Sequence, residues 1–496
     1  MKKNTTSRRE ALKQIGLFGA AGTSAAFGLS VQSASAQDSR TVQQPSETSE
    51  SSSRNRRRLS SREGFHAELK RLVDTTPMVD SHEHLQDECE RLKNNGNCIR
   101  LLQHYLSDDF VSAGLRRREV FGPNAENESP VVLWRRLEPF WNAVKNTGYG
   151  RAARITIKEL YGIDKIEESV ISKLQQAFAE LAVPGFYEKI LRGHCNLESC
   201  QVAWGAYVET TQPTLLLQDI NIDGFQEGAI SGEEISRVGI TEIKDLNDYH
   251  DYIQRWFQKY ALYAAAIKST MAYRRGLDFE KTSAKQAEEP FKRKLEGVRL
   301  NPEDTKLLQD HLSWFCISQA DQYELPVKLH LGYYAGTGEM PVSRIEKNVA
   351  QAADLCLASP QTRFMFMHTA YPYGHALTAV VKQFKHAYLQ TCWAWIIDPL
   401  GTKDFLKRYL VTAPSNKIHV FGGDFTGVEN VVGHARIARN GVYAALAELV
   451  EEEYLEREDA LELVEPLLRG NARRIFNLEK KYEAARNVPW RTIHNH

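Results

Sequence analysis

Met78-Val79-Asp80-Ser81-His82-Glu83-His84 is the stretch from which the fold can be inferred, because a short apolar run ends in two histidines spaced two residues apart. Side chains two apart on a strand face the same way, so both imidazoles can bind one cation. A second pair, His494-Asn495-His496, stands at the C-terminus and follows no apolar run. The first pair therefore predicts a metal site at the end of a strand.

Three further apolar runs end in a residue that can bind metal. His330 follows residues 326–329, His368 follows 364–367, and Asp424 follows 420–423. In a (β/α)₈ barrel, catalytic groups project from the C-terminal ends of the strands. Four strands that each present His or Asp in this way favour one shared site over four separately packed polar residues. The paired glycines before Asp424 would let the backbone approach the metal closely.

The chain alternates strand patterns with helical patterns, which predicts βαβ units and a parallel sheet. Eight candidate strands favour a closed TIM-type (β/α)₈ barrel of class α/β over an open sheet. The candidates are residues 78–80, 201–208, 214–217, 264–268, 326–331, 363–368, 387–391 and 418–422. The run 264–268 is ambiguous, because it could also complete the helix that starts near Leu246.

The connection after the first strand is unusually long, at roughly 110 residues where a few are ordinary. Helical patterns at 131–144 and 167–181 predict that residues 86–198 form a helical insertion on the first βα loop. Such loops lie on the catalytic face of a barrel, so the insertion could form part of the pocket wall or a lid. Residues 430–482 are expected to be mostly helical and to pack outside the barrel.

The N-terminus resembles an export signal. Ser7-Arg8-Arg9-Glu10-Ala11-Leu12-Lys13 is similar to the twin-arginine motif, although it lacks the usual Phe at position 11. The apolar stretch 15–29 is too short for a stable membrane span, and Ala34-Ser35-Ala36 supplies a cleavage site. We therefore expect a signal peptide at 1–36, a disordered linker at 37–62 and the folded domain at 63–482. The twin-arginine machinery would deliver the protein to the periplasm or the extracellular space.

Composition narrows the range of partners. Lys plus Arg and Asp plus Glu number 63 each, so charge gives no reason to expect nucleic acid or an anionic membrane as partner. Seven cysteines without a C-x-x-C motif are expected to be mostly buried small hydrophobes. Export would permit a Cys195–Cys200 or Cys89–Cys98 disulfide. The sequence leaves a homo-oligomer open.

The strand-end motifs resemble a known family. The segments VDSHEHL (79–85), VKLHLG (327–332), FMFMHTAYP (364–372) and VFGGDF (420–425) resemble the first, fifth, sixth and eighth strand motifs of the amidohydrolase superfamily, in the same order. This resemblance, over about 64–476, implies one or two divalent metals per chain, zinc first and manganese, iron or nickel as alternatives. His82, His84 and Asp424 would bind the first metal. His330 and His368 would bind a second, or orient water and substrate if only one is present.

The resemblance also implies a role for a lysine. Two-metal members carboxylate a fourth-strand lysine to a carbamate that bridges the metals, and Lys268 is the matching residue. A carbamate replaces a cation by an oxygen ligand, as two metals require. Lys268 could instead be a structural lysine at a helix end, and Lys328 is a rival for the same role. Without a carbamate the site would hold one metal.

The predicted chemistry follows from the metal, which lowers the pKa of bound water towards ~7. Asp424 would accept the water's proton and pass it to the leaving group, with His368 as the second catalytic candidate. The sequence thus predicts a metal-dependent hydrolase acting on a small ester, lactone or amide. Loop residues after the strands are candidates for substrate binding, or else pack against the insertion. They are Tyr273, Arg274, Tyr371, His375 and Trp393. Arg274 could pair with a carboxylate, which suggests a small organic acid or sugar acid.

Two other functions stay open. The long insertion and the segment YGRAARITIKELYGI (149–163) also resemble uronate isomerase, which would need one metal and no carbamate. A decarboxylase is open on the same grounds, so the number of metals would discriminate. An inactive exported binding barrel is a third alternative, and the complete set of ligands argues against it.

Overall fold

The computed structural model describes residues 61–94, 96–121, 127–336 and 340–490. The predicted signal peptide at 1–36 lies outside the described residues, as does the linker up to residue 60. The first described helix, α2 (Arg62–Thr75), begins where the folded domain is predicted to start. None of the helices in these described ranges is long and apolar enough to cross a membrane.

The strands form two parallel sheets, with the orders β1-β2-β3 and β4-β5-β6-β7-β8-β9. The strands are β1 (Met78–Glu83), β2 (Leu197–Val202), β3 (Leu216–Gln218), β4 (Ile220–Asn221), β5 (Ile267–Ser269), β6 (Val327–Leu329), β7 (Phe364–Phe366), β8 (Ala387–Gln390) and β9 (Ile418–His419). Only Asp219 separates β3 from β4. The ambiguous run 264–268 does not complete helix α10, which ends at Tyr260, and its last two residues belong to β5, which begins at Ile267.

Backbone hydrogen bonds join the two sheets. Ser81 N donates to Phe421 O at 3.1 Å, and Asp424 N donates to His82 O at 2.9 Å, so β1 lies beside the residues that follow β9. At the other junction Asp219 N donates to Val202 O at 2.8 Å. The C-terminal ends of the first and last strands are therefore neighbours.

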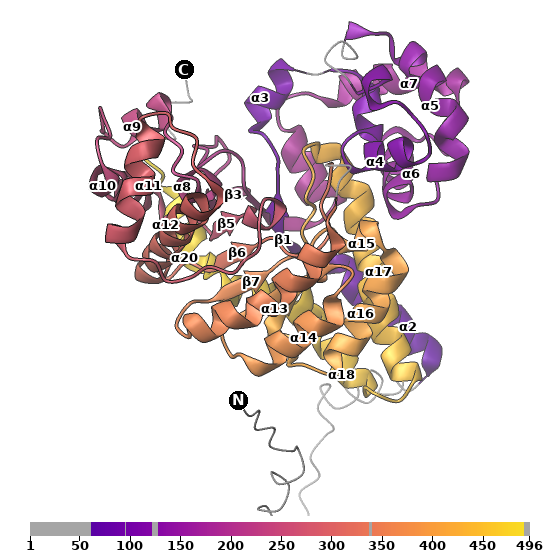
Figure 1. Ribbon diagram of the computed structural model, residues 1–496. Helices are drawn as coiled ribbons and strands as arrows, with labels where there is room; N and C mark the ends of the chain where they lie inside the picture. The colour runs from indigo at the N-terminus through magenta and orange to yellow at the C-terminus, as the bar shows by residue number, and fades with distance from the viewer. Residues whose placement is uncertain (1–60, 95, 122–126, 337–339, 491–496) are drawn as a thin grey trace, which may run out of the picture. The chain divides into compact units, whose positions relative to one another are not determined.

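Helices separate most of the strands and continue to the C-terminal end of the described chain (Figure 1). After α2 they are α3 (Glu88–Lys93), α4 (Tyr105–Ser112), α5 (Pro130–Val144), α6 (Gly148–Tyr161), α7 (Glu168–Leu181), α8 (Asp223–Gln226), α9 (Gly232–Arg237), α10 (Leu246–Tyr260), α11 (Ala284–Leu295), α12 (Pro302–Gln322), α13 (Val342–Ala358), α14 (Gly374–Gln383), α15 (Ala394–Ile397), α16 (Pro399–Leu410), α17 (Val431–Glu451), α18 (Arg457–Glu462), α19 (Asn471–Ile475) and α20 (Leu478–Arg486). Local sequence explains many of their boundaries. Asn301, for example, caps α12 by accepting a hydrogen bond from Asp304 N at 2.8 Å, and Pro302 occupies the first turn.

The segment between β1 and β2 contains α3 to α7, and α4 to α7 are drawn in purple as one group in Figure 1. Helices α5 and α7 coincide with the helical patterns predicted at 131–144 and 167–181. This segment also reaches the strand ends. The Tyr105 ring of α4 lies 4.4 Å from the Trp393 ring beyond β8, and the Tyr149 ring of α6 stacks on Tyr105 at 5.4 Å.

The C-terminal region is helical, as the sequence predicts, and it supports the opposite ends of the strands. Arg439 on α17 donates to Thr76 O at 2.9 Å, before β1, and to Asn196 O at 3.0 Å, before β2. Burial lowers the pKa of Arg439 to about 10, which still leaves it charged at neutral pH. One buried guanidinium thus fixes the start of two neighbouring strands.

All seven cysteines are free, so neither the Cys195–Cys200 nor the Cys89–Cys98 disulfide is formed. Six of the seven are buried, and only Cys89 is partly exposed. The buried thiols belong to the hydrophobic core, where a cysteine packs as a small apolar group. This agrees with the expectation that most of them are buried small hydrophobes.

Candidate metal centre

Asp424 lies at the centre of a cluster of histidines. His82 Nε2 is 3.3 Å from Asp424 Oδ1, and His84 Nε2 is 3.1 Å from the same oxygen. The three side chains offer ligand atoms that lie within 4.8 Å of one another. The backbone hydrogen bond from Asp424 to His82 holds these two strand ends in place. The spacing is one that a single cation can bridge.

The other two predicted strand ends converge on the same place. His368 Nδ1 is 3.8 Å from Asp424 Oδ2, and the His368 ring lies 6.2 Å from the His82 ring. The His330 ring lies 4.5 Å from His368, and its Nε2 is 2.9 Å from Tyr333 O. All five predicted His and Asp residues are therefore brought together in one cluster.

The cluster has buried polar atoms that lack protein partners. His82 Nδ1 and both ring nitrogens of His368 are buried and make no hydrogen bond to any described residue. Buried polar atoms are normally paired, so these nitrogens fit an additional ligand. Burial lowers the pKa of His82 and of His368, which keeps both imidazoles in the neutral form that binds metal. Imidazoles with one carboxylate suit a divalent transition metal.

Asp424 is the charged member of the cluster. Burial opposes its ionised form, but the interactions with His82, His84 and His368 outweigh burial and hold the pKa of Asp424 well below its usual value. Its partners are these histidines, with no arginine among its ion pairs within the described chain. Asp424 is thus an ionised carboxylate beside the neutral imidazoles of His82 and His368.

Three residues of the cluster have a left-handed backbone. The φ angles are 59° at His368, 46° at Cys392 and 57° at Asp424, and each residue follows a strand closely. This conformation is unfavourable for residues other than glycine and often marks functional sites. The strained positions coincide with the convergence of side chains, which supports the assignment of a functional site here.

Lys268 and Lys328 pair in register on neighbouring strands, but only one of them has a partner. Lys328 Nζ donates to Asp219 Oδ2 and Gln201 Oε1, both at 2.6 Å. Lys268 is 1% exposed, and its side-chain amine makes no hydrogen bond or ion pair with any residue that the structure describes. Burial lowers its pKa, which favours the neutral amine that carboxylation requires. Lys328, the rival for the carbamate, is already committed to an ion pair.

The glycines before Asp424 leave space for neighbouring side chains. A Cβ on Gly423 would lie 1.7 Å from Glu83 Oε1, and a Cβ on Gly422 would lie 2.8 Å from Cys392 Sγ. The glycines therefore make room for Glu83 and Cys392 beside the last strand.

Two buried acids in β1, Asp80 and Glu83, were not identified from the sequence. Asp80 accepts hydrogen bonds from His82 N at 3.0 Å and Gly423 N at 3.2 Å, and Glu83 accepts one from Phe425 N at 2.7 Å. Burial raises the pKa of Asp80 to about 7 and also raises that of Glu83. These bonds hold β1 against the Asp424 segment. The signal in the sequence that could have identified them is the presence of acidic residues within an apolar strand.

Two of the five predicted substrate-binding residues, Tyr273 and Trp393, adjoin the cluster, and Tyr371 lies further out. The Tyr273 ring lies 4.4 Å from the His330 ring, and Trp393 stacks on His368 at 4.9 Å. The Tyr371 ring lies 6.2 Å from the Tyr333 ring, and the Tyr333 ring lies 6.3 Å from the Trp393 ring. Aromatic rings thus surround the histidines.

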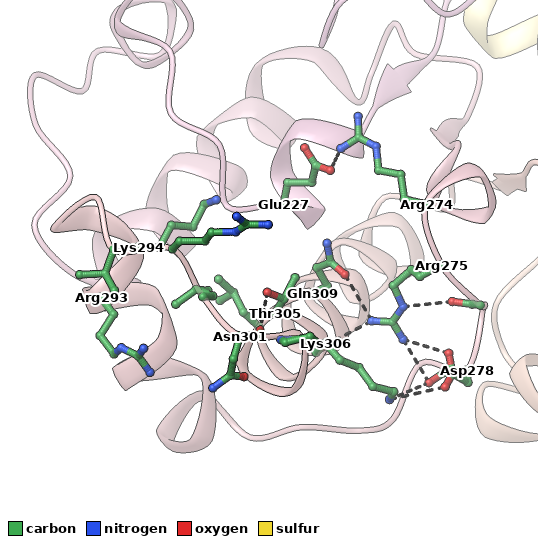
Figure 2. Close-up of a pocket in the computed structure, with 16 residues that line it drawn as sticks. Glu227, Arg274, Arg275, Asp278, Arg293, Lys294, Asn301, Thr305, Lys306 and Gln309 are labelled. Carbon is green, nitrogen blue, oxygen red and sulfur yellow. Dashed lines mark hydrogen bonds and ion pairs between the residues drawn. The ribbon is translucent and has the colours of Figure 1, made fainter. Parts of the chain in front are cut away.

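The other two predicted residues lie elsewhere. Arg274 forms an ion pair with Glu227 and lines a separate pocket of about 1100 Å³, shown in Figure 2 together with Arg275, which pairs with Asp278. None of the clustered His and Asp residues lines that pocket. His375 is exposed on α14, with its ring 6.4 Å from that of Phe405. The spacing of the motifs predicted the loops that carry these two residues, but it did not predict where their side chains point.

Two residues of the segment between β1 and β2 lie beside the Asp424 segment, and sequence reasoning missed them. The ring of Phe425, which follows Asp424 in the sequence, lies 5.5 Å from the His104 ring and 5.4 Å from the Tyr105 ring. No motif marks these residues, although the segment as a whole is predicted to form part of the pocket wall.

Comparison with known proteins supports the family resemblance. Residues 238–478, which include β5 to β9, match the amidohydrolase family model. No curated protein sequence matches the chain. Among solved structures, the uronate isomerase of Thermotoga maritima is 13% identical with a TM-score of 0.69, covering 83% of this chain and 97% of that one. The glucuronate isomerase of Caulobacter crescentus is 16% identical with a TM-score of 0.68, covering 85% and 95%.

A protein from Lactobacillus casei, provisionally named a metal-dependent hydrolase, is 14% identical with a TM-score of 0.58, covering 83% of this chain and 98% of that one. At these identities the structural likeness shows the fold alone. Residues 238–478 therefore resemble the amidohydrolase family, and the chain shares its fold with uronate isomerases.

Proposed function

We propose that the protein is a metal-dependent hydrolase of small organic esters, lactones or amides. The observation that carries this proposal is the convergence of His82, His84, His368 and Asp424 at the ends of parallel strands, where ligand atoms of His82, His84 and Asp424 lie within 4.8 Å of one another. Buried ring nitrogens without protein partners support it further.

The proposed architecture is a (β/α)₈ barrel that carries a helical insertion. Backbone hydrogen bonds between β1 and the residues after β9 support closure of the barrel. With β3 and β4 counted as one interrupted strand, the two sheets supply eight strands. Helices α3 to α7 would form the insertion, and the contacts of Tyr105 with Trp393 and Phe425 make it a wall of the site.

In this proposal His82, His84 and Asp424 hold a divalent cation, with zinc as the first choice for such a donor set. The bound cation would supply Lewis acidity, which makes water acidic near neutral pH and polarises a carbonyl. Asp424 accepts the proton of the attacking water at its carboxylate and delivers it to the leaving group. His368, 3.8 Å from Asp424, orients the reacting groups. Tyr273, Tyr371 and Trp393 confine the substrate.

A second cation is proposed beside the first, held by His330 and His368 with a carboxylated Lys268. The support is that Lys268 is buried next to this cluster without a partner among the described residues, while Lys328 is paired with Asp219. A carbamate would turn an unfavourable buried cation into a ligand.

Isomerisation of a sugar acid is the second candidate function. It is favoured by the likeness to uronate isomerases over 97% and 95% of their lengths. Such a reaction would use one metal and an unmodified lysine. Two metals per chain favour hydrolysis, and one metal favours isomerisation or decarboxylation.

Metal analysis of the purified protein tests the site directly. We expect at least one equivalent of divalent metal in the parent protein and its loss in His82→Ala/His84→Ala. His375→Ala, which removes an exposed histidine outside the cluster, is the matched control and should keep the metal. Full metal content in the double variant would overturn the site. A screen of lactones, amides, phosphoesters and uronates then separates hydrolase from isomerase and from an inactive binding barrel.

Export is proposed separately, on the basis of Arg8 and Arg9 and the Ala34-Ser35-Ala36 cleavage site. The experiment is fractionation of cells that express the full chain, compared with Arg8→Lys/Arg9→Lys. The parent should be processed after Ala36 and leave the cytoplasm, whereas the variant should stay inside unprocessed. Equal export of both would exclude the twin-arginine route.

A further inference from the structure

Cys392 stands inside the metal cluster, although nothing in the proposed mechanism uses it. It lies two residues beyond β8, and its side chain is fully buried. Its Sγ, a ring nitrogen of His368 and a carboxylate oxygen of Asp424 all lie within 4.8 Å of one another. Among the cysteines of the described ranges, Cys392 is the only one that belongs to such a group.

The ring nitrogens of the histidine beside Cys392 lack hydrogen-bond partners among the described residues. Both ring nitrogens of His368 are fully buried without a hydrogen bond to any described residue, and Trp393 stacks on the face of the ring. The ring edge is therefore the part of His368 that is available to a ligand. A buried donor pair of thiol and imidazole next to an ionised carboxylate differs from the apolar surroundings in which a cysteine acts as a small hydrophobe.

The carboxylate of Asp424 is oriented toward both groups. Its Oδ1 faces His82 and His84 at 3.3 and 3.1 Å, whereas its Oδ2 faces His368 at 3.8 Å. The two oxygens therefore point to two different sets of donors. Gly422 completes the arrangement, because a Cβ there would lie 2.8 Å from Cys392 Sγ. Glycine lets the thiol approach the segment between β9 and Asp424.

We propose that Cys392 is a thiolate ligand of a metal ion that is held together with His368 and Asp424. Asp424 would then be shared between this position and the one formed by His82 and His84. A thiolate with an imidazole and a carboxylate selects borderline or soft ions such as Zn²⁺ and Co²⁺ over Mg²⁺ and Ca²⁺. The inference rests on the metal site proposed above and adds a specific ligand to it.

Cobalt substitution tests the ligand without reference to activity. Metal is removed from the mature protein with a chelator and replaced by Co²⁺, and the bound Co²⁺ is counted by mass spectrometry. A cobalt–thiolate bond gives an intense near-ultraviolet charge-transfer band, which imidazole and carboxylate ligands do not give. We expect the band in the parent and its complete loss in Cys392→Ser. Cys316→Ser, a substitution of an equally buried cysteine on α12, should keep the band.

The outcomes separate the two proposals. Co²⁺ bound without a charge-transfer band would overturn the role of Cys392 and leave the metal site standing. No bound Co²⁺ would overturn the metal site itself. If Cys392→Ser does not fold, X-ray absorption on the parent decides, because a thiolate ligand requires a sulfur neighbour at about 2.3 Å from the metal. A spectrum fitted by nitrogen and oxygen alone would contradict the proposal.

Discussion

Two lysines, Lys268 on β5 and Lys328 on β6, pair in register on adjacent strands, and both are buried. Lys328 is held by Asp219, Gln201 and the carbonyl of Ser81, at 2.6, 2.6 and 2.7 Å. Lys268 has no such partner among the described residues and faces the histidine cluster. A buried charge is stable when it is paired, and an unpaired one is expected where chemistry requires it. The difference indicates that the residues around Lys328 have a structural role and that those around Lys268 have a functional role. We call these two groups the structural layer and the functional layer.

If the functional layer governs turnover, Asp424→Asn should have the largest effect. The substitution preserves shape but removes the charge and the proton acceptor, and loss of a general base lowers rates by about 10²–10⁴-fold. The variant should stay folded, but its unfolding free energy should fall, because the interactions with the histidines stabilise the ionised carboxylate. Turnover with the best substrate of the screen and a denaturation curve check both statements. An Asn variant within a few-fold of the parent would show that another group accepts the proton.

Lys268→Ala should lose the second metal and most of the activity, because the proposed carbamate can no longer form. Added bicarbonate should not restore either. The fold should be retained, since the substitution removes no hydrogen bond or ion pair of the described residues. Metal counting on parent and variant, with thermal melting as the fold control, makes the measurement. Retention of two metals and normal turnover would assign Lys268 to the structural layer as well.

Lys328→Met should instead reduce stability. It leaves the carboxylate of Asp219 buried without its cation, and breaking a buried ion pair in this way costs about 3–5 kcal/mol. Urea unfolding measures the loss. The double variant Lys328→Met/Asp219→Leu removes both charges and should recover much of it. Equal stability of the single variant and the parent would remove the basis for a structural layer.

Lys481 on α20 is an intermediate case with the smallest expected effect. Within the part of the chain that the structure describes, its amine donates only to the carbonyls of Ala261 and Leu262, at 2.8 and 3.2 Å. Burial lowers its pKa to about 8. The pKa of a lysine in the unfolded chain is about 10.4. At a pH between the two pKa values, Lys481 binds a proton in the unfolded chain but not in the folded chain, so its contribution to stability rises with pH. The contribution is on the order of 1–3 kcal/mol across this window.

The check is the difference between parent and Lys481→Met in urea unfolding at about pH 7 and about pH 10, which cancels the other titrating groups. The parent should gain stability relative to the variant as the pH rises. A difference that is independent of pH would show that Lys481 is charged in the folded protein throughout.

The sequence was sufficient for the order of elements and for the convergence of the ligands. Apolar runs separated by helical patterns define the strands locally, and parallel strands bring their C-terminal ends to one face. His82, His84, His330, His368 and Asp424 can therefore be grouped by sequence alone, since only their positions relative to a strand end matter. The ambiguous run 264–268 fails this local test because α10 and β5 are separated by only six residues, with no breaker between them.

Other relations were decided by tertiary structure. The ion pair of Lys328 with Asp219 joins residues on different strands, and it depends on strand register and side-chain direction, which no local pattern encodes. Arg274 turns from the cluster to Glu227 for the same reason. Cys392 follows its strand without any motif, and only packing against Gly422 places its thiol beside His368 and Asp424. Spacing along one strand fixes which residues share a face, whereas contacts between strands are fixed only when the chain is folded.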